Sequence, residues 1–400
     1  MISAKCKSQN EGRKCILHFA FCIGHFAFLM VGLLTLGVPL VAAEPLLDPA
    51  LPYQAEKSSP VQYDVDYAIV VTPPYHTKVL KVWLPLPQSD AAQEVESRSL
   101  ASFPAEVKPQ VGSESVFGNK FAYFEFHEPQ GAQIVRHQFR VKSWELSWNL
   151  QADKIAAVEN WPKSFDVFRR GESQAVVVDE RFQALLTQIV PRRGNPLADL
   201  SSVMLWVGDN FTYDHHDASL KADSTHGLEK RRGHCSDYHG FCAAMGRALG
   251  YPTRVTYGLN TFPKNSPSHC KLEAYVPPYG WVSFDVSETQ RLVASIKKDR
   301  QLDEARKKEL IAAATKRLTS GFRDNTWFCM TRGTDYDLVP KASRKVPVVR
   351  TAYIEADGVP LPDPDPADPD AREFAWMTVM KVKPDREVKY PFTDYQSLSK

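Results

Sequence analysis

The hydrophobic pattern of this chain changes once, near residue 150, and the change limits the fold to a mixed α and β class. Apolar residues alternate with mostly polar or small ones over residues 61–71, and alternation returns over residues 135–141. A period of two is typical of half-buried strands. Several such segments, separated by turns such as residues 117–120, favour an antiparallel β-sandwich, which we place at residues 58–148.

Beyond residue 175 the apolar residues recur at helical spacing. A second helix is indicated at Asn195-Pro196, because Asn caps helix starts and Pro suits the first helical position. A third helical pattern begins at Cys235 and ends at Gly250. Strand-like segments then follow at residues 253–259, 271–276 and 281–286. Helices followed by consecutive strands predict an α+β core, at residues 175–290, rather than a βαβ repeat.

The last part of the chain, residues 291–400, is predicted to be a C-terminal extension. It contains a charged, alanine-rich helix at residues 302–318 and further strand segments. Proline and aspartate alternate over residues 360–370, a composition that predicts an exposed, extended linker.

The N-terminal sequence has the features of an export signal. Lysine and arginine precede an almost continuous apolar run over residues 16–41, which ends in Val41-Ala42-Ala43. This predicts a signal peptide at residues 1–43, with the mature chain periplasmic or secreted. The run is longer than the usual signal core of ~7–15 residues. An uncleaved N-terminal membrane anchor is therefore the alternative, and no later stretch is apolar enough to span a bilayer.

Net charge and cysteine content argue against a nucleic-acid-binding protein and against a disulfide-stabilised scaffold. A formal net charge of only +2 gives no electrostatic footprint for nucleic acid. Of the seven cysteines, four lie beyond the predicted signal, which is too few for a disulfide scaffold of this length. The pairing of these four is left open among three possibilities by the sequence. They are Cys235, Cys242, Cys270 and Cys329.

The candidate catalytic residues are concentrated between residues 233 and 285. Cys235 stands where a loop enters a helix, a position that favours the reactive thiolate. His269 precedes one strand and Asp285 ends the next, so adjacent antiparallel strands could bring the two side chains together. A cysteine nucleophile, an imidazole base and an orienting carboxylate follow the logic of catalytic triads.

The motifs around these residues resemble the transglutaminase-like superfamily, which includes transglutaminases, bacterial cysteine proteases and peptide N-glycanases. The resemblance is to the bacterial, exported cysteine protease or acyltransferase type, and it covers about 90 residues. It rests on Gly233-His234-Cys235-Ser236-Asp237, on residues 247–255 with Arg247-Ala248-Leu249-Gly250, and on His269, Glu273, Gly280-Trp281 and Asp285.

The resemblance implies a papain-like core, with a helix packed on an antiparallel sheet, and a catalytic triad of Cys235, His269 and Asp285. The implied activity is acyl transfer on peptide or carboxamide bonds through a thioester, with no metal or cofactor. Two positions depart from the family pattern. Lys271 replaces the usual tryptophan, and His234 stands where true transglutaminases tend to have glutamine. The second departure favours hydrolysis over amine crosslinking.

Two other readings stay open at this stage. Six histidines within 55 residues invite a zinc-dependent hydrolase, although no ligand framework with zinc-site spacing is present. An inactive member of the family could serve as an extracytoplasmic binding or scaffold module. The expected partner is a peptide or protein substrate, with no nucleic acid and no membrane beyond a possible anchor. Substrate identity and oligomeric state leave no pattern in the sequence.

Overall fold

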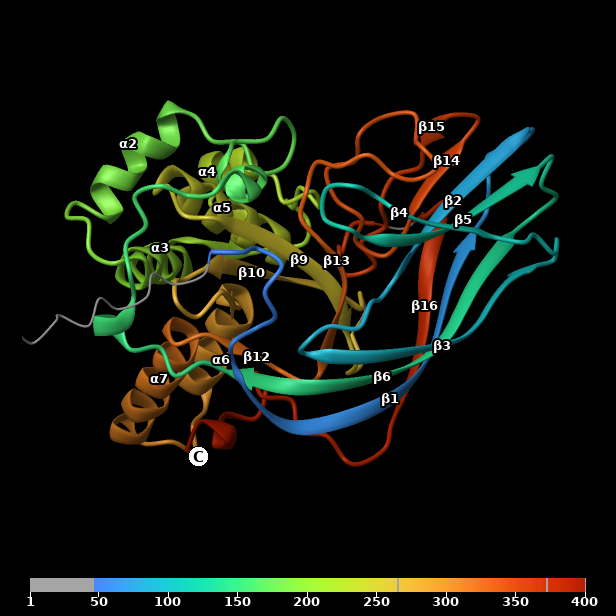
Figure 1. Ribbon diagram of the computed structural model, residues 1–400. Coiled ribbons are helices and arrows are strands. Elements are labelled where there is room, and N and C mark those ends of the chain that lie inside the picture. The colour runs from blue at the N-terminus through green and yellow to red at the C-terminus, as the bar shows by residue number, and fades with distance from the viewer. Residues whose placement is uncertain (1–46, 265, 372, 400) are drawn as a thin grey trace, which may run out of the picture. The chain divides into compact units, whose positions relative to one another are not determined.

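A computed structural model describes residues 47–264, 266–371 and 373–399. The predicted signal peptide at residues 1–43 lies outside the described residues. None of the helices in the described part of the chain combines the length and the apolar character needed to cross a bilayer. The described residues form an antiparallel β-sandwich and a core in which a helix packs on an antiparallel sheet (Figure 1). This is the predicted α+β fold class.

Two sheets make the sandwich. In the first, β1 lies between β6 and β16, and β6 also pairs with β3 and β12. Its strands are β1 (Glu56–Val71), β3 (Gln93–Phe103), β6 (Gln133–Ser147), β12 (Phe322–Arg323) and β16 (Trp376–Pro384). The second sheet has the order β15-β14-β2-β5-β4. Its strands are β2 (Val79–Leu86), β4 (Gln110–Ser113), β5 (Lys120–His127), β14 (Tyr353–Ala356) and β15 (Val359–Pro360).

The period-two pattern of β1 builds the core of the sandwich. Tyr63, Val65 and Tyr67 are buried, and they share one apolar cluster with Leu80 and Val82 of β2 in the facing sheet. Each such side chain contributes roughly 1.5–3 kcal/mol when it is fully buried. The apolar residues of the predicted alternation therefore lie on the face that one sheet presents to the other.

Four strands from the predicted C-terminal extension, residues 291–400, belong to these two sheets: β12, β14, β15 and β16. β16 pairs antiparallel with β1 along nine residues of register, from Tyr63↔Pro384 to Val71↔Trp376. β14 pairs with β2, and β15 pairs with β14. The pairing covers one edge of β1, which would otherwise present unpaired backbone groups. Segments about 300 residues apart in the chain thus lie side by side (Figure 1).

The α+β core is built around the helix α5 (Cys235–Ala248), which is buried along almost its whole length. The helix packs on a sheet of order β11-β10-β9-β13. The strands of this sheet are β9 (Thr253–Asn260), β10 (Ser268–Tyr275), β11 (Trp281–Phe284) and β13 (Trp327–Arg332). The strand β13 also comes from beyond residue 290, and Phe328 on it reaches the sandwich core.

The remaining elements surround this core. The helices are α1 (Asp166–Arg169), α2 (Glu180–Ile189), α3 (Pro196–Asn210), α4 (Ser224–Lys230), α6 (Val286–Lys298) and α7 (Glu304–Thr319). Short elements are η1 (Ala152–Lys154), η2 (Lys163–Phe165), η3 (Tyr395–Ser399) and the parallel pair β7 (Thr212–Tyr213) and β8 (Arg232–Gly233). The predicted cap of α3 is present, since the Asn195 side chain accepts a hydrogen bond from the Ala198 backbone N–H at 2.9 Å.

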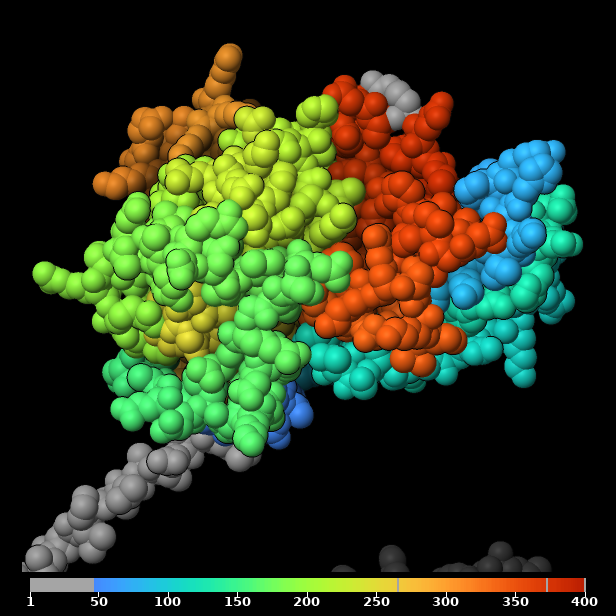
Figure 2. All heavy atoms as spheres, turned by 90° about the horizontal axis from the view of Figure 1, so that it is seen from above, coloured from blue at the N-terminus to red at the C-terminus, as the bar shows by residue number. Residues whose placement is uncertain are grey.

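The stretch at residues 360–370, predicted to be an exposed linker, is exposed only in part. Pro364 and Asp365 are buried, and the Pro364 carbonyl accepts a hydrogen bond from the Arg350 guanidinium at 3.3 Å. Asp365 accepts a hydrogen bond from His215 Nδ1 at 2.8 Å. Composition alone overstated the exposure of this stretch, because several of its acidic side chains have imidazole partners elsewhere in the fold. Figure 2 shows the C-terminal part of the chain, in orange and red, against the yellow-green surface of the core.

Candidate functional site

The start of α5 fixes the position of Cys235. Asp237 accepts a hydrogen bond from the His234 backbone N–H at 3.1 Å, and His234 Nδ1 accepts one from the Ser236 N–H at 3.1 Å. The two hydrogen bonds form a reciprocal capping box at the start of the helix. Gly233 has φ +138°, and a Cβ there would lie 2.2 Å from the Asp237 carboxylate. Only glycine therefore allows the tight entry that places Cys235 at the first position of the helix.

His269 and Asp285 meet at one end of the core sheet. The strands β10 and β11 pair antiparallel, and Asp285 follows directly after β11 as the N-cap of α6. His269 Nε2 lies 2.7 Å from Asp285 Oδ2, and both side chains are buried. His269 and Cys235 line the same cavity of about 320 Å³. The structure thus brings together the three residues that the sequence analysis named.

The charges at this site favour a thiolate beside an imidazolium. Burial acts to lower the pKa of His269, but the charges of Asp285 and Cys235 outweigh it and raise that pKa to about 9. A hydrogen bond from Cys270, together with the imidazoles of His234 and His269, holds the pKa of Cys235 well below its usual value despite burial. A nucleophile with a depressed pKa beside a charged base is the arrangement found in thiol enzymes generally.

Comparison with known proteins agrees with this geometry. The family model described as the transglutaminase-like superfamily matches residues 183–286, which include α5 and the sheet strands that carry His269 and precede Asp285. These residues form a transglutaminase-like core. The match covers about a quarter of the chain, so it identifies this core and not the β-sandwich.

Relatives of the whole chain are distant. A protein of Cytophaga hutchinsonii proposed to be a cysteine protease shares the fold, with a TM-score of 0.59 and 15% identity over 86% of this chain and 98% of that chain. The periplasmic domain of TgpA from Pseudomonas aeruginosa matches with a TM-score of 0.33 and 15% identity, over 60% and 92% of the two chains. An uncharacterized protein of Haemophilus influenzae is 24% identical over 223 residues, 48% of this chain. The match spans 56% of that relative's own length.

Lys271 marks where this transglutaminase-like core differs from the family pattern. Its side chain is buried, with Nζ 2.6 Å from Asp285 Oδ2 and 2.9 Å from Asp324 Oδ2. Burial acts to raise the pKa of Asp285, yet the charges of Lys271 and His269 hold it well below its usual range. Asp285 is therefore shared between His269 and a lysine, and Asp324 supplies the second negative charge that the lysine needs. No motif in the sequence pointed to Asp324.

Cys270 interacts with His239 and Cys235, although it is not one of the three residues predicted to form the triad. All four cysteines of the core and β13 are free thiols. His239 Nε2 accepts a hydrogen bond from the Val286 backbone N–H at 3.1 Å, so the imidazole proton is on Nδ1, 3.5 Å from Cys270 Sγ. Burial lowers the pKa of His239 to about 4, which keeps this imidazole neutral. Cys270 can then accept from His239 and donate its own S–H to the Cys235 thiolate.

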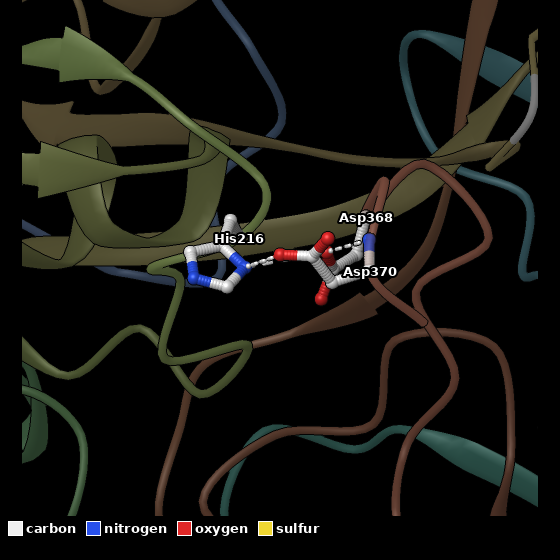
Figure 3. A group of neighbouring side chains, drawn as sticks. All are labelled: His216, Asp368 and Asp370. Atoms are coloured by element: carbon white, nitrogen blue, oxygen red, sulfur yellow. Dashed lines mark hydrogen bonds and ion pairs between the residues drawn. The ribbon is translucent and has the colours of Figure 1, made fainter. Parts of the chain in front are cut away.

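The histidine-rich loop offers one group that could hold a metal ion among the described residues. His216, Asp368 and Asp370 present ligand atoms within 4.8 Å of one another. Figure 3 shows the His216 ring facing the carboxylate of Asp370, at a distance of 2.7 Å from Nδ1 to Oδ2. His216 and Asp370 are 61% and 69% exposed, and the ion pair between them explains their approach. None of the three lines the cavity that contains Cys235.

Proposed function

We propose that this chain is a thiol-dependent acyltransferase acting on peptide or carboxamide bonds, working mainly as a hydrolase. The observation that carries the proposal is that Cys235 and His269 line one cavity, and that the Asp285 carboxylate lies 2.7 Å from His269 Nε2. The N-terminal sequence supports a further proposal, that the protein acts outside the cytoplasm after export. We also propose a peptide or protein substrate, because the site geometry supports acyl transfer from an amide bond.

The proposed reaction begins when the Cys235 thiolate attacks the carbonyl carbon of the scissile amide. The new C–S bond converts the carbonyl into a tetrahedral oxyanion, and the Cys235 backbone N–H at the helix start is positioned to donate to it. The His269 imidazolium gives its proton to the leaving amine as the C–N bond breaks, which leaves a thioester on Cys235. Water then attacks the thioester with neutral His269 as base, releasing the acid and restoring the thiolate. An amine in place of water would give crosslinking.

Asp285 holds the His269 ring in the orientation that these reaction steps require. Its carboxylate accepts from Nε2, so Nδ1 is the nitrogen left to face Cys235. The carboxylate also stabilises the imidazolium that must donate to the leaving amine. Asp285 thus acts through His269, as a positioning residue.

The proposal predicts a rate that falls at alkaline pH. Because the pKa of His269 is raised to about 9, the imidazolium is present below that pH and is lost above it. We expect the kcat/KM of amide turnover, measured on a pool of fluorogenic peptides, to fall about tenfold per pH unit above pH 9. The activity should be lost after treatment with iodoacetamide and retained in EDTA.

The opposite response to the two inhibitors would point to a different mechanism. Activity that survives alkylation of Cys235 but is lost in EDTA would contradict the thiol mechanism and favour a zinc-dependent hydrolase. A protein whose Cys235 is alkylated readily but that turns over no member of the pool would favour the binding or scaffold role.

A further inference from the structure

The charged side chains around the Cys235 cavity are of one sign. Among the described residues that line it, Lys264, Arg291 and Arg350 carry positive charge and none is a carboxylate. The polar part of the wall also includes three histidines, two serines and a tyrosine: His215, His234, His269, Ser266, Ser268 and Tyr213. A cavity lined in this way attracts anions and disfavours cations.

Two of the three cations share a single counter-ion. Lys264 Nζ lies 2.6 Å from Glu288 Oε1, and Arg291 Nη1 lies 2.9 Å from the same oxygen. Glu288 is almost fully buried beneath them, with 5% of its side chain exposed. Two positive charges against one leave this side of the cavity with a net positive charge.

Arg350 is the least satisfied of the three. The residue is 5% exposed, and its guanidinium has five N–H donors. Its hydrogen bond in the described structure is to the Pro364 carbonyl, at 3.3 Å. No described carboxylate lies within ion-pair distance of it, although its charge acts on the nearby carboxylates of Asp363 and Asp365. Asp365 accepts from His215 instead, and Asp363 lines a separate small cavity beside Arg350. A buried guanidinium with unused N–H donors at a cavity wall favours a ligand that accepts hydrogen bonds from it.

We propose that Arg350 is the anchor of an anion subsite, and that the cavity accepts acyl donors with a carboxylate close to the amide carbonyl that Cys235 attacks. This proposal rests on the proposed function, because it names the substrate class of the same cavity. A guanidinium can bind a carboxylate through two parallel N–H···O hydrogen bonds, a geometry that Lys264 cannot provide. The net positive charge near Lys264 and Arg291 would draw the same carboxylate into the cavity.

The test uses two alkylating reagents that differ only in charge. Iodoacetate carries a carboxylate, and iodoacetamide is its neutral isostere. The ratio of their rates with Cys235, measured by peptide mass spectrometry at one pH, cancels the thiolate fraction of the cysteine. The same ratio for a free peptide thiol is the reference. We expect the wild-type ratio to exceed the reference by about tenfold or more.

Variants assign the effect to Arg350. Arg350→Gln should lower the ratio toward the reference, and Arg350→Lys, which keeps the charge but not the fork, should give an intermediate value. Arg136→Gln, at an exposed arginine that pairs with Asp66 in the sandwich, is the matched control and should keep the wild-type ratio. If Arg350→Gln does not fold, the wild-type and Arg350→Lys ratios decide the question.

The outcomes separate the subsite from the proposed function. A wild-type ratio equal to the free-thiol reference would overturn the subsite, and so would a raised ratio that folded Arg350 variants leave unchanged. The assay needs no turnover. A raised, Arg350-dependent ratio in a protein that hydrolyses no amide would keep the subsite and reject the proposed function, whereas amide turnover with a reference ratio would do the reverse.

Discussion

Replacing Cys235 with alanine is expected to lower amide turnover by about 10⁴-fold or more, because triad members act as a unit and loss of the nucleophile removes the covalent route. The side chain lies at the first position of α5 and does not support the helix cap, which His234 and Asp237 provide. The fold should therefore survive the change. Turnover is measured as kcat/KM on the same peptide pool, with circular dichroism as the check on folding.

Cys242→Ala is the matched control for this prediction. Cys242 lies on the same helix and is also a buried free thiol, but burial alone acts on it and raises its pKa. Its substitution should leave turnover within about threefold of wild type, since a protonated, packed thiol does not act as a nucleophile. Full turnover by Cys235→Ala on substrates that the wild type cleaves would reject the nucleophile assignment.

Lys271→Met should destabilise the protein by about 3–5 kcal/mol, because it leaves the buried carboxylates of Asp285 and Asp324 without their shared cation. Methionine keeps the length of the side chain and removes only its charge. The free energy of unfolding is measured by urea denaturation at neutral pH, where both carboxylates are ionised in the wild type.

The double variant Lys271→Met/Asp324→Asn separates charge from packing. It removes the buried lysine together with one of its two partners and leaves Asp285 paired with His269. We expect it to be more stable than Lys271→Met alone, by roughly 1–3 kcal/mol of coupling between neighbouring sites. A single variant as stable as wild type, or a double variant less stable than the single, would show that the lysine does not neutralise these carboxylates.

Much of the core could be predicted because its signals are local. The Asn195-Pro196 start of α3, the entry of Cys235 into α5 and the alternation in β1 each depend on residues close together in the sequence. The approach of His269 to Asp285 follows from two adjacent strands joined by a turn, which is again a short-range arrangement. Residue type and spacing are sufficient for such features.

The parts that escaped prediction depend on contacts between distant segments. Asp324 meets Lys271 across about fifty residues, and Arg350 reaches the Cys235 cavity from a loop before β14 that carries no motif. The pairing of β16 with β1 and the burial of Asp365 have the same origin. A single sequence gives the character of each segment but not its distant partner, so the proline- and aspartate-rich stretch looked like a linker although it forms part of the cavity wall.

The measurement that tests the central claim most directly is the rate of Cys235 alkylation by iodoacetamide as a function of pH, in the wild type and in His269→Gln. A thiolate held beside the His269 imidazolium predicts fast labelling well below pH 7 in the wild type, and a clear shift of the profile to higher pH in the variant. Labelling that rises only near the ordinary thiol pKa of about 8.5, with the same profile in both proteins, would contradict the account.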